Sequence, residues 1–279
     1  MTTVTLLHPG AMGAAVAAQA IAAGHEVLWV PEGRSEATSR RAKEAGATAC
    51  DSLGEALEQS EIVLSICPPQ AAEDVAATVA GSAFSGVYVD ANAINPQRMQ
   101  HIAEEIRPGA TVLDGAIFGP PPGGRRAARL YLAGDPLAMD LVEPLFKNTV
   151  LHVRRANGHA GSASALKMAF ASYQKAARTL AGVAHALAAA YGVGGELTAE
   201  AEVMASNILS DPGYLPSVAA RAWRWAPEMQ DVADTLRAAD LPADMAAAAV
   251  AVMSHWEGDK DQYDLPVSEV LAHLRGQIE

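Results

Sequence analysis

The chain has 279 residues, of which half are hydrophobic but only 5% aromatic, and its formal net charge is −12 at pH 7. The length is sufficient for two domains, and the negative charge argues against a surface that binds nucleic acid or an anionic membrane. Two cysteines, Cys50 and Cys67, are too few for a disulfide framework and lack the spacing of metal ligands. We therefore expect a cytoplasmic protein with buried thiols, no metal site and no membrane-spanning segment, since no apolar run approaches 18 residues.

The first 30 residues have the pattern of a dinucleotide-binding unit. An apolar strand at Val4–Leu7 is followed by a turn at His8–Gly13, a helix of small residues to Ala23, and a second strand at Val27–Val30. The first glycine of the usual G-x-G-x-x-G motif is replaced by His8. The alternative is an ordinary strand–helix–strand start without a ligand. We predict that the dinucleotide is bound by Pro9, Gly10, Ala11, Met12 and Gly13.

Strands and helices alternate along the next 120 residues, which predicts an α/β fold with a doubly wound sheet of the Rossmann type. The region 114–124, rich in glycine and proline, is expected to be a loop. The expected strands are 62–66, 87–89, 111–113, 129–133 and 149–153, and the expected helices are 35–45, 52–59, 71–80, 96–106 and 136–146.

Beyond Gly158 the sequence shows only helical periodicity. It begins with a long connecting helix at about 161–191, which the glycine-rich segment 192–195 ends. We therefore predict a dinucleotide-binding domain at 1–157 and an all-helical substrate and dimerisation domain at 158–279. The expected later helices are 198–208, 215–223, 228–238, 243–256 and 267–274.

Five blocks in the same order along the chain resemble the β-hydroxyacid dehydrogenase and 6-phosphogluconate dehydrogenase superfamily, in the branch that has its own helical carboxyl-terminal domain. The blocks are Pro9–Gly13, Cys67-Pro68-Pro69, Asp90–Pro96, Asp114–Pro120, and Gly158–Gly161 leading to Lys167. The resemblance implies an NAD(P)-dependent oxidoreductase that forms homodimers through its helical domain.

By position, the resemblance implies that Lys167 is the catalytic residue. Asn92 would contact cofactor and substrate, Phe118 and Gly119 would line the substrate site, and Cys67, Pro68 and Pro69 would form a wall against the cofactor. The chain departs from the family at two points. Ala171 stands where an asparagine is usual, and Phe118 and Pro120 replace groups that hold a substrate carboxylate.

The residues themselves leave alternatives open. Lys167 lies on an otherwise small or apolar helix face, where burial would lower its pKa toward neutrality, but a lysine there can also extend to solvent. Gln174 follows on the same stripe as a substrate-binding residue or a domain-interface donor. Asn92 is a ligand residue after a strand or an ordinary turn residue.

Cofactor preference depends on the segment after the second strand. Glu32 stands about where an acid binds the ribose of NAD, whereas Arg34 and Ser35 at the start of the next helix suit the 2′-phosphate of NADP. We predict NADP(H), with Arg34 and Ser35 as its ligands and NAD as the less favoured cofactor.

The leading interpretation is an oxidoreductase that moves a hydride between the nicotinamide and a small hydroxy or carbonyl substrate, with Lys167 exchanging the proton. The alternatives are an imine reductase of similar architecture and a dinucleotide-binding protein without catalysis. Retention of a lysine at position 167 favours the carbonyl chemistry.

Overall fold

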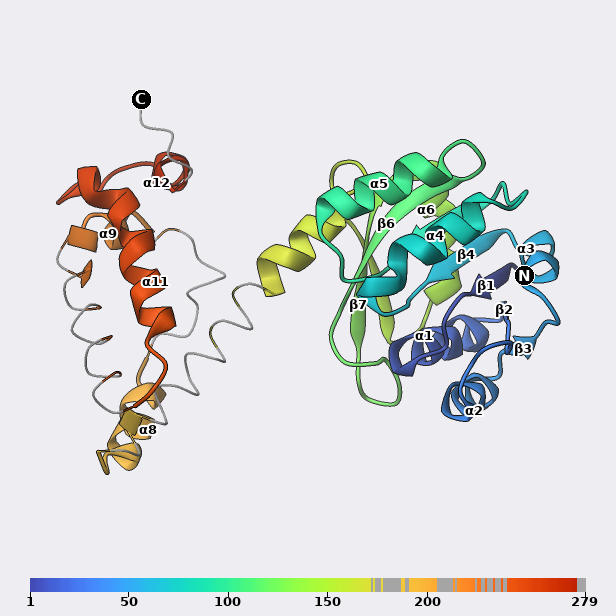
Figure 1. Ribbon diagram of the computed structural model, residues 1–279, viewed down its shortest axis with the longest axis horizontal. Coiled ribbons are helices and arrows are strands. Elements are labelled where there is room, and N and C mark those ends of the chain that lie inside the picture. The colour runs from blue at the N-terminus through green and yellow to red at the C-terminus, as the bar shows by residue number, and fades with distance from the viewer. Residues whose placement is uncertain are drawn as a thin grey trace. The chain divides into compact units, whose positions relative to one another are not determined.

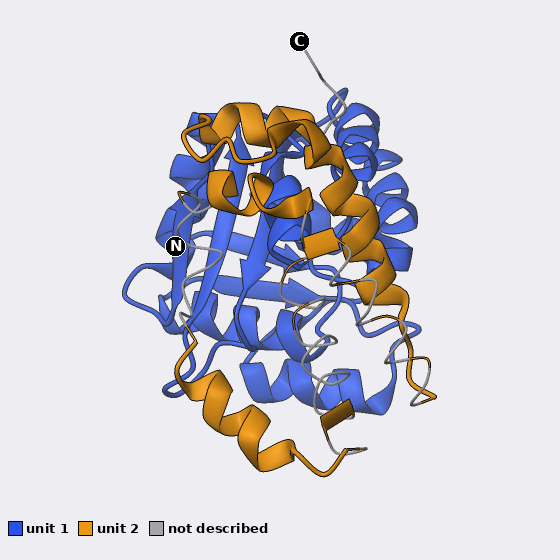
Figure 2. Cartoon of the chain, turned by 90° about the vertical axis from the view of Figure 1, so that its left-hand side faces the viewer, with its two compact units in different colours: residues 1–171 blue, residues 172–279 orange. Residues whose placement is uncertain are grey.

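The computed structural model divides the chain into two compact units, residues 1–171 and 172–279 (Figure 2). The domain boundary predicted at 157/158 stays a prediction. The structure describes all residues except 172, 174–176, 178–186, 189–190, 205–212, 214, 224, 227–228, 230–232, 234–236, 238–239 and 275–279.

The first unit is built on an eight-stranded sheet in the order β3-β2-β1-β4-β5-β6-β7-β8 (Figure 1). Neighbouring strands are parallel except β6 and β7, which pair antiparallel. The order turns back between β1 and β4, so the ligand crevice of such a sheet is expected at the carboxyl ends of these two strands. The strands are β1 (Thr3–Leu6), β2 (Glu26–Trp29), β3 (Thr48–Ala49), β4 (Ile62–Ser65), β5 (Val87–Asp90), β6 (Thr111–Phe118), β7 (Ala128–Gly134) and β8 (Leu151–Arg155).

Helices cover both faces of this sheet and form a separate core on each. Helices α1 and α6 contribute Val16, Ala20 and Val142 to one core, whereas α4 and α5 contribute Val79 and Ile102 to the other. The helices of this unit are α1 (Ala11–Ala22), α2 (Glu36–Ala45), α3 (Leu53–Glu58), α4 (Ala72–Ala80), α5 (Pro96–Ile106), α6 (Pro136–Val142) and the 3₁₀ helices η1 (Pro69–Ala71) and η2 (Glu143–Phe146). The predicted doubly wound α/β fold is confirmed.

One local prediction for the first unit is wrong, and one short strand was not predicted. Residues 114–118 are not a loop, because β6 continues to Phe118 and its backbone pairs with β7 from Leu113 to Phe118. The two-residue strand β3 was not expected; it pairs with β2 at Leu28 and Trp29. In both cases the strand is held by hydrogen bonds to a distant segment, which local composition does not encode.

The second unit is helical in the part that the structure describes. Its elements are α8 (Gly194–Glu202), α9 (Leu215–Ala219), α11 (Asp244–Met253), the 3₁₀ helix η4 (Ser254–Asp259) and α12 (Val267–His273). A small core forms around Trp256, whose indole N–H donates to Val270 O at 2.9 Å. Most of the helix expected at 228–238 and the end of that expected at 198–208 lie outside the described residues.

The long helix predicted at 161–191 is described in part. Residues 162–171 are helical and belong to the first unit, whereas most of 172–190 lies outside the described residues. The predicted end is confirmed, because Gly192 has a left-handed φ of 72° and Val193 N donates to Ala188 O at 2.9 Å. The next helix begins earlier than the expected residue 198, since α8 starts at Gly194. Among the described helices, none combines the length and apolar character that a membrane crossing requires.

Candidate active site

The glycine turn joins the end of β1 to the start of α1. Gly10 is the N-cap of α1 and offers no side chain to its first N–H groups, which therefore point toward the crevice as donors for an anion. A Cβ at Gly13 would lie 2.2 Å from His8 O, so only glycine allows the helix to approach the strand this closely. A turn of this geometry suits the pyrophosphate of a dinucleotide, and the binding role predicted for Pro9, Ala11, Met12 and the two glycines stays a prediction.

A cavity of about 170 Å³ lies on one side of this turn, at the carboxyl ends of β1 and β2. Leu7, Val30 and Val75 give it apolar walls, and Glu32 and Arg34 both lie at its rim. Its size and apolar walls suit an adenine ring. Because the acid and the arginine border the same cavity, the geometry accommodates either the ribose of NAD or the 2′-phosphate of NADP.

Arg34 is held over the end of β1 in this structure. Its Nη2 donates to Leu7 O at 2.9 Å, and its Nη1 lies 3.2 Å from His8 Nδ1. Ser35 is the N-cap of α2, where its Oγ accepts a hydrogen bond from Thr38 N at 3.3 Å. The helix start beside Arg34 thus has the polarity expected of a phosphate site.

A second cavity, of about 190 Å³, lies on the other side of the turn and brings Lys167 together with Met12, Cys67, Pro69 and Asn92. This cavity lies between the carboxyl ends of β4, β5 and β6 and the helix at 162–171. Its lining residues are Met12, Ile66, Cys67, Pro69, Ala91, Asn92, Ala93, Ile117 and Lys167. Pro68 precedes this wall as the N-cap of η1 and is exposed.

Lys167 enters this cavity from the helix at 162–171. Its Nζ donates to Ile117 O at 2.6 Å and lies 4.7 Å from the centroid of the Phe118 ring. That ring is buried and packs edge-on against Tyr131 and Phe170, with centroids 5.2 and 5.3 Å away. The ammonium is therefore held by a carbonyl and an aromatic face, and Lys167 is a cavity residue rather than a lysine extended to solvent.

The helix that carries Lys167 is anchored to β6 by Asp114, which the sequence did not single out. This buried carboxylate accepts hydrogen bonds from Gly161 N at 2.9 Å, Ser164 N at 3.0 Å and Ser164 Oγ at 2.7 Å. Burial raises the pKa of Asp114, and these hydrogen bonds oppose the rise. Asp114 and Ile117 thus hold the same helix at two points, Ser164 and Lys167, through contacts 50 residues apart in sequence.

Asn92 connects the ends of β4 and β5. Its Oδ1 accepts from Cys67 N at 2.7 Å, and its Nδ2 donates to Ser65 Oγ at 3.0 Å and Asp90 Oδ2 at 3.1 Å. Burial raises the pKa of Asp90 to about 7; the hydrogen bonds from Asn92 oppose the rise and the nearby Asp114 adds to it. Asn92 therefore shapes the cavity wall, and its predicted contact with cofactor or substrate stays a prediction.

The other residues that were predicted to bind substrate do not line this cavity in the part of the chain that the structure describes. Gly119 has a left-handed φ of 113°, and a Cβ there would lie 3.1 Å from Ala127 O, so the β6–β7 connection itself requires a glycine. Phe118 is the last residue of β6, and its ring contacts the ammonium of Lys167. Gln174 lies outside the described residues. Substrate contacts by these residues stay predictions.

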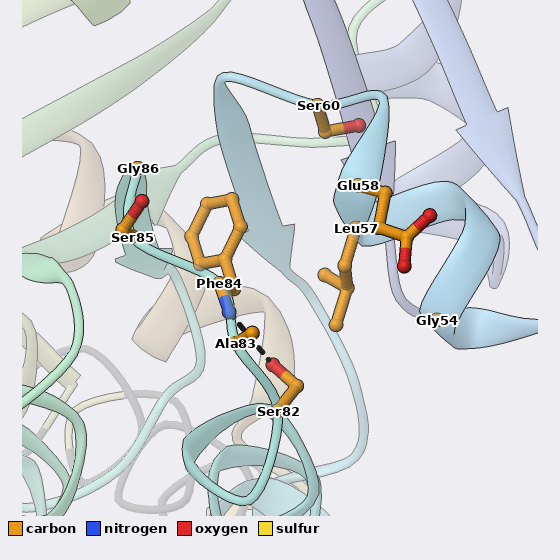
Figure 3. Close-up of a pocket in the computed structure, with 9 residues that line it drawn as sticks. All are labelled: Gly54, Leu57, Glu58, Ser60, Ser82, Ala83, Phe84, Ser85 and Gly86. Atoms are coloured by element: carbon orange, nitrogen blue, oxygen red, sulfur yellow. Dashed lines mark hydrogen bonds between the residues drawn. The ribbon is translucent and has the colours of Figure 1, made fainter.

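A cavity of about 340 Å³ lies at the opposite edge of the sheet, where Ser60 and Gly86 come just before β4 and β5 (Figure 3). Parallel sheets bind ligands at the carboxyl ends of their strands, not at this edge. Ser82 Oγ accepts a hydrogen bond from Phe84 N at 3.2 Å and so serves the local turn. None of the predicted site residues lines this cavity. Among the described residues, no group of three or more His, Cys, Asp or Glu side chains could hold a metal ion.

Comparison with known families and structures agrees with this geometry. Residues 3–154 match the model of the NAD binding domain of 6-phosphogluconate dehydrogenase, and residues 188–256 match a domain of unknown function, DUF1932. No curated protein matches the chain significantly.

Solved structures with the same fold cover almost the whole chain at low identity. An imine reductase from Aspergillus terreus, in complex with NADPH4 and dibenz[c,e]azepine, has a TM-score of 0.77 at 18% identity, covering 98% of this chain and 99% of its own. The 3-hydroxyisobutyrate dehydrogenase of Mycobacterium tuberculosis has a TM-score of 0.64 at 18% identity and covers 99% of both chains. The conserved protein MTH1747, described as similar to 3-hydroxyacid dehydrogenases, has a TM-score of 0.61 at 24% identity, covering 94% of this chain and 100% of its own.

Proposed function

The chain belongs to the family of the NAD binding domain of 6-phosphogluconate dehydrogenase, which makes it an NAD(P)-dependent oxidoreductase, and from this premise we propose its cofactor and chemistry. It is a cytoplasmic NADP(H)-dependent enzyme that interconverts a small hydroxy compound and its carbonyl, with Lys167 as the general acid and base. Residues 1–157 are the proposed cofactor-binding domain, and residues 158–279 are the proposed substrate and dimerisation domain of a homodimer.

The observation that carries this proposal is the position of Lys167. It shares one cavity with Met12 of the glycine turn and with Cys67, Pro69 and Asn92, which follow the neighbouring strands β4 and β5. In a sheet of this order the nicotinamide end of a dinucleotide lies at the carboxyl ends of these strands. This supports the proposal that a substrate oxygen meets the nicotinamide within reach of the lysine ammonium.

In this proposal the cofactor and the residues around Lys167 have separate roles. The bound cofactor supplies or takes the hydride. In its charged form Lys167 gives a proton to the carbonyl oxygen that becomes a hydroxyl, and in its neutral form it takes that proton back in the reverse direction. Ile117 O and the Phe118 ring hold Nζ in the cavity, and Asp114 fixes the helix on which the lysine stands.

Cofactor preference is proposed from the rim of the adenine-sized cavity. The guanidinium of Arg34, which lines this cavity, and the start of α2 at Ser35 are the proposed ligands of a 2′-phosphate, and NADP(H) is the expected cofactor. Replacing Arg34 by Ala should weaken NADPH binding about tenfold or more and leave NADH binding nearly unchanged. Equal losses for both cofactors, or a wild type that prefers NADH, would contradict this assignment.

Imine reduction is the second candidate, because imine reductases are among the solved structures that share this fold over the full chain. The lysine at position 167 favours carbonyl chemistry over this candidate. The third candidate is a dinucleotide-binding protein without turnover. Oxidation of NADPH with aldehydes, keto acids and cyclic imines separates the three. Turnover with carbonyls supports the proposal, turnover with imines alone supports the second candidate, and binding without turnover supports the third.

A further inference from the structure

The histidine in the glycine turn has no role in the function proposed above, although it occupies the position where dinucleotide-binding turns usually have their first glycine. Its backbone does not require a glycine: the described non-glycine residues with positive φ are Asn148, Asp240 and Asp261. His8 differs from the usual glycine in having a side chain that can donate or accept a hydrogen bond. The imidazole lies over the turn, with Cδ2 and Nε2 each 3.2 Å from the place where a Cβ on Gly10 would stand.

The contact with Arg34 determines which ring nitrogen carries the proton. Nη1 of Arg34 lies 3.2 Å from His8 Nδ1, and a guanidinium can only donate hydrogen bonds. Nδ1 must therefore accept, and the neutral ring carries its proton on Nε2, on the side of the turn. Burial lowers the pKa of His8, and Arg34 and Arg41 of α2 lower it further, so the neutral form prevails near pH 7.

We propose that His8 is a side-chain ligand of the cofactor pyrophosphate, donating from Nε2 beside the N–H groups at the start of α1. This inference rests on the proposed cofactor binding. The side chain adds a donor at a turn that otherwise binds phosphates through the backbone, in a protein whose net charge of −12 disfavours anions. Arg34 favours this tautomer of His8 and lies at the rim where the 2′-phosphate is proposed to bind. A neutral imidazole can also donate from Nε2 without Arg34, so NADH binding by Arg34→Ala is still expected to stay nearly unchanged.

The test is the affinity of full-length variants for ligands that differ in their phosphates, measured by titration calorimetry at pH 7.5. Replacing His8 by Leu removes the donor, and replacing it by Gln keeps an N–H at similar reach. His152, which is exposed on the distant strand β8, provides the matched control His152→Leu. Adenosine 2′-monophosphate is the third ligand beside NADPH and NADH, because it has the 2′-phosphate but no pyrophosphate.

We expect His8→Leu to weaken NADPH and NADH binding by about the same factor, roughly tenfold or more for a lost hydrogen bond to a charged group. His8→Gln and His152→Leu should remain within about threefold of wild type, the range that a retained donor allows. Adenosine 2′-monophosphate should bind His8→Leu as well as it binds wild type, which also shows that the adenine side is folded.

Three results would overturn the assignment of His8. They are unchanged binding of both dinucleotides by His8→Leu, a loss confined to NADPH, and a loss of adenosine 2′-monophosphate binding equal to that of NADPH. A wild type that binds neither dinucleotide would instead contradict the proposed function itself.

Discussion

Removal of the Asp114 carboxylate should loosen the helix that carries Lys167. The side chain accepts three hydrogen bonds, two from backbone N–H groups and one from the Ser164 hydroxyl, all in a buried environment. Asp114→Ala leaves the two N–H groups and the hydroxyl without this acceptor, at about 1 to 3 kcal/mol for each unsatisfied group. Because burial raises the pKa of Asp114, burying the carboxylate has its own cost, and we expect a net loss of about 2 to 4 kcal/mol.

Two variants make this prediction specific. Asp114→Asn keeps all three contacts if its amide oxygen accepts from Gly161 N and Ser164 N while its NH₂ donates to the serine oxygen, so it should lose much less stability. Asp135→Ala removes an exposed N-cap that accepts from Leu137 N at 2.7 Å, and it should cost about 1 kcal/mol.

Urea unfolding and hydrogen–deuterium exchange provide the assay. Asp114→Ala should lose amide protection at Gly161 and Ser164 and lose turnover while retaining NADPH affinity, because the adenine side of the site is untouched. The reasoning is refuted if Asp114→Ala is destabilised no more than Asp135→Ala and the amides of Gly161 and Ser164 stay protected.

Three further predictions concern the glycine turn, the buried carboxyl of Asp90 and the assembly of the chain. Gly13→Ala should abolish measurable dinucleotide binding in calorimetry, because its Cβ would lie 2.2 Å from His8 O; near-normal affinity would contradict the cradle. Burial raises the pKa of Asp90 to about 7 from 3.8, so between these values the folded state holds a proton that the unfolded chain loses. The contribution of Asp90 to the free energy of unfolding should therefore fall as pH rises from about 4 to 7. Asp90→Asn should flatten that slope in urea unfolding; an unchanged slope would argue against the shift. Light scattering at micromolar concentration should give a homodimer, and a monomer would contradict the assembly proposed for residues 158–279.

The sequence allowed the Rossmann-type sheet to be predicted because its signals are local. Val4–Leu7 and Ile62–Ile66 are short apolar runs between turn residues, as buried parallel strands require. Helix α5 has the bounds that were predicted for it. Asn95 caps it, accepting from Arg98 N at 2.9 Å, and Pro96 occupies its first position.

The extension of β6 could not be predicted in the same way. Gly119 and the prolines after it indicate a loop, and they do form the β6–β7 connection, but residues 114–118 become a strand by pairing with β7. That pairing depends on tertiary structure. The sequence signal for Asp114 is its charge within a largely apolar strand, since a carboxylate suits the N-terminus of a later helix.

Five of the residues that the sequence singled out, Met12, Cys67, Pro69, Asn92 and Lys167, line one cavity, and their roles in binding and catalysis stay predictions. The contacts that hold them, such as Lys167 Nζ on Ile117 O, join residues 50 positions apart and follow from packing rather than from any local pattern.

The proton-exchanging role of Lys167 is the central claim, and Lys167→Met tests it most directly. Methionine keeps most of the length and the apolar stem of the lysine over the Phe118 ring but cannot exchange a proton. Steady-state turnover and NADPH affinity should be measured together, with the carbonyl substrate that the panel identifies. We predict that turnover falls by a factor on the order of 10² to 10⁴, the usual share of general acid–base catalysis, while folding and NADPH affinity remain near wild type. A well-folded variant that binds NADPH normally and turns over within a few-fold of wild type would contradict the mechanism.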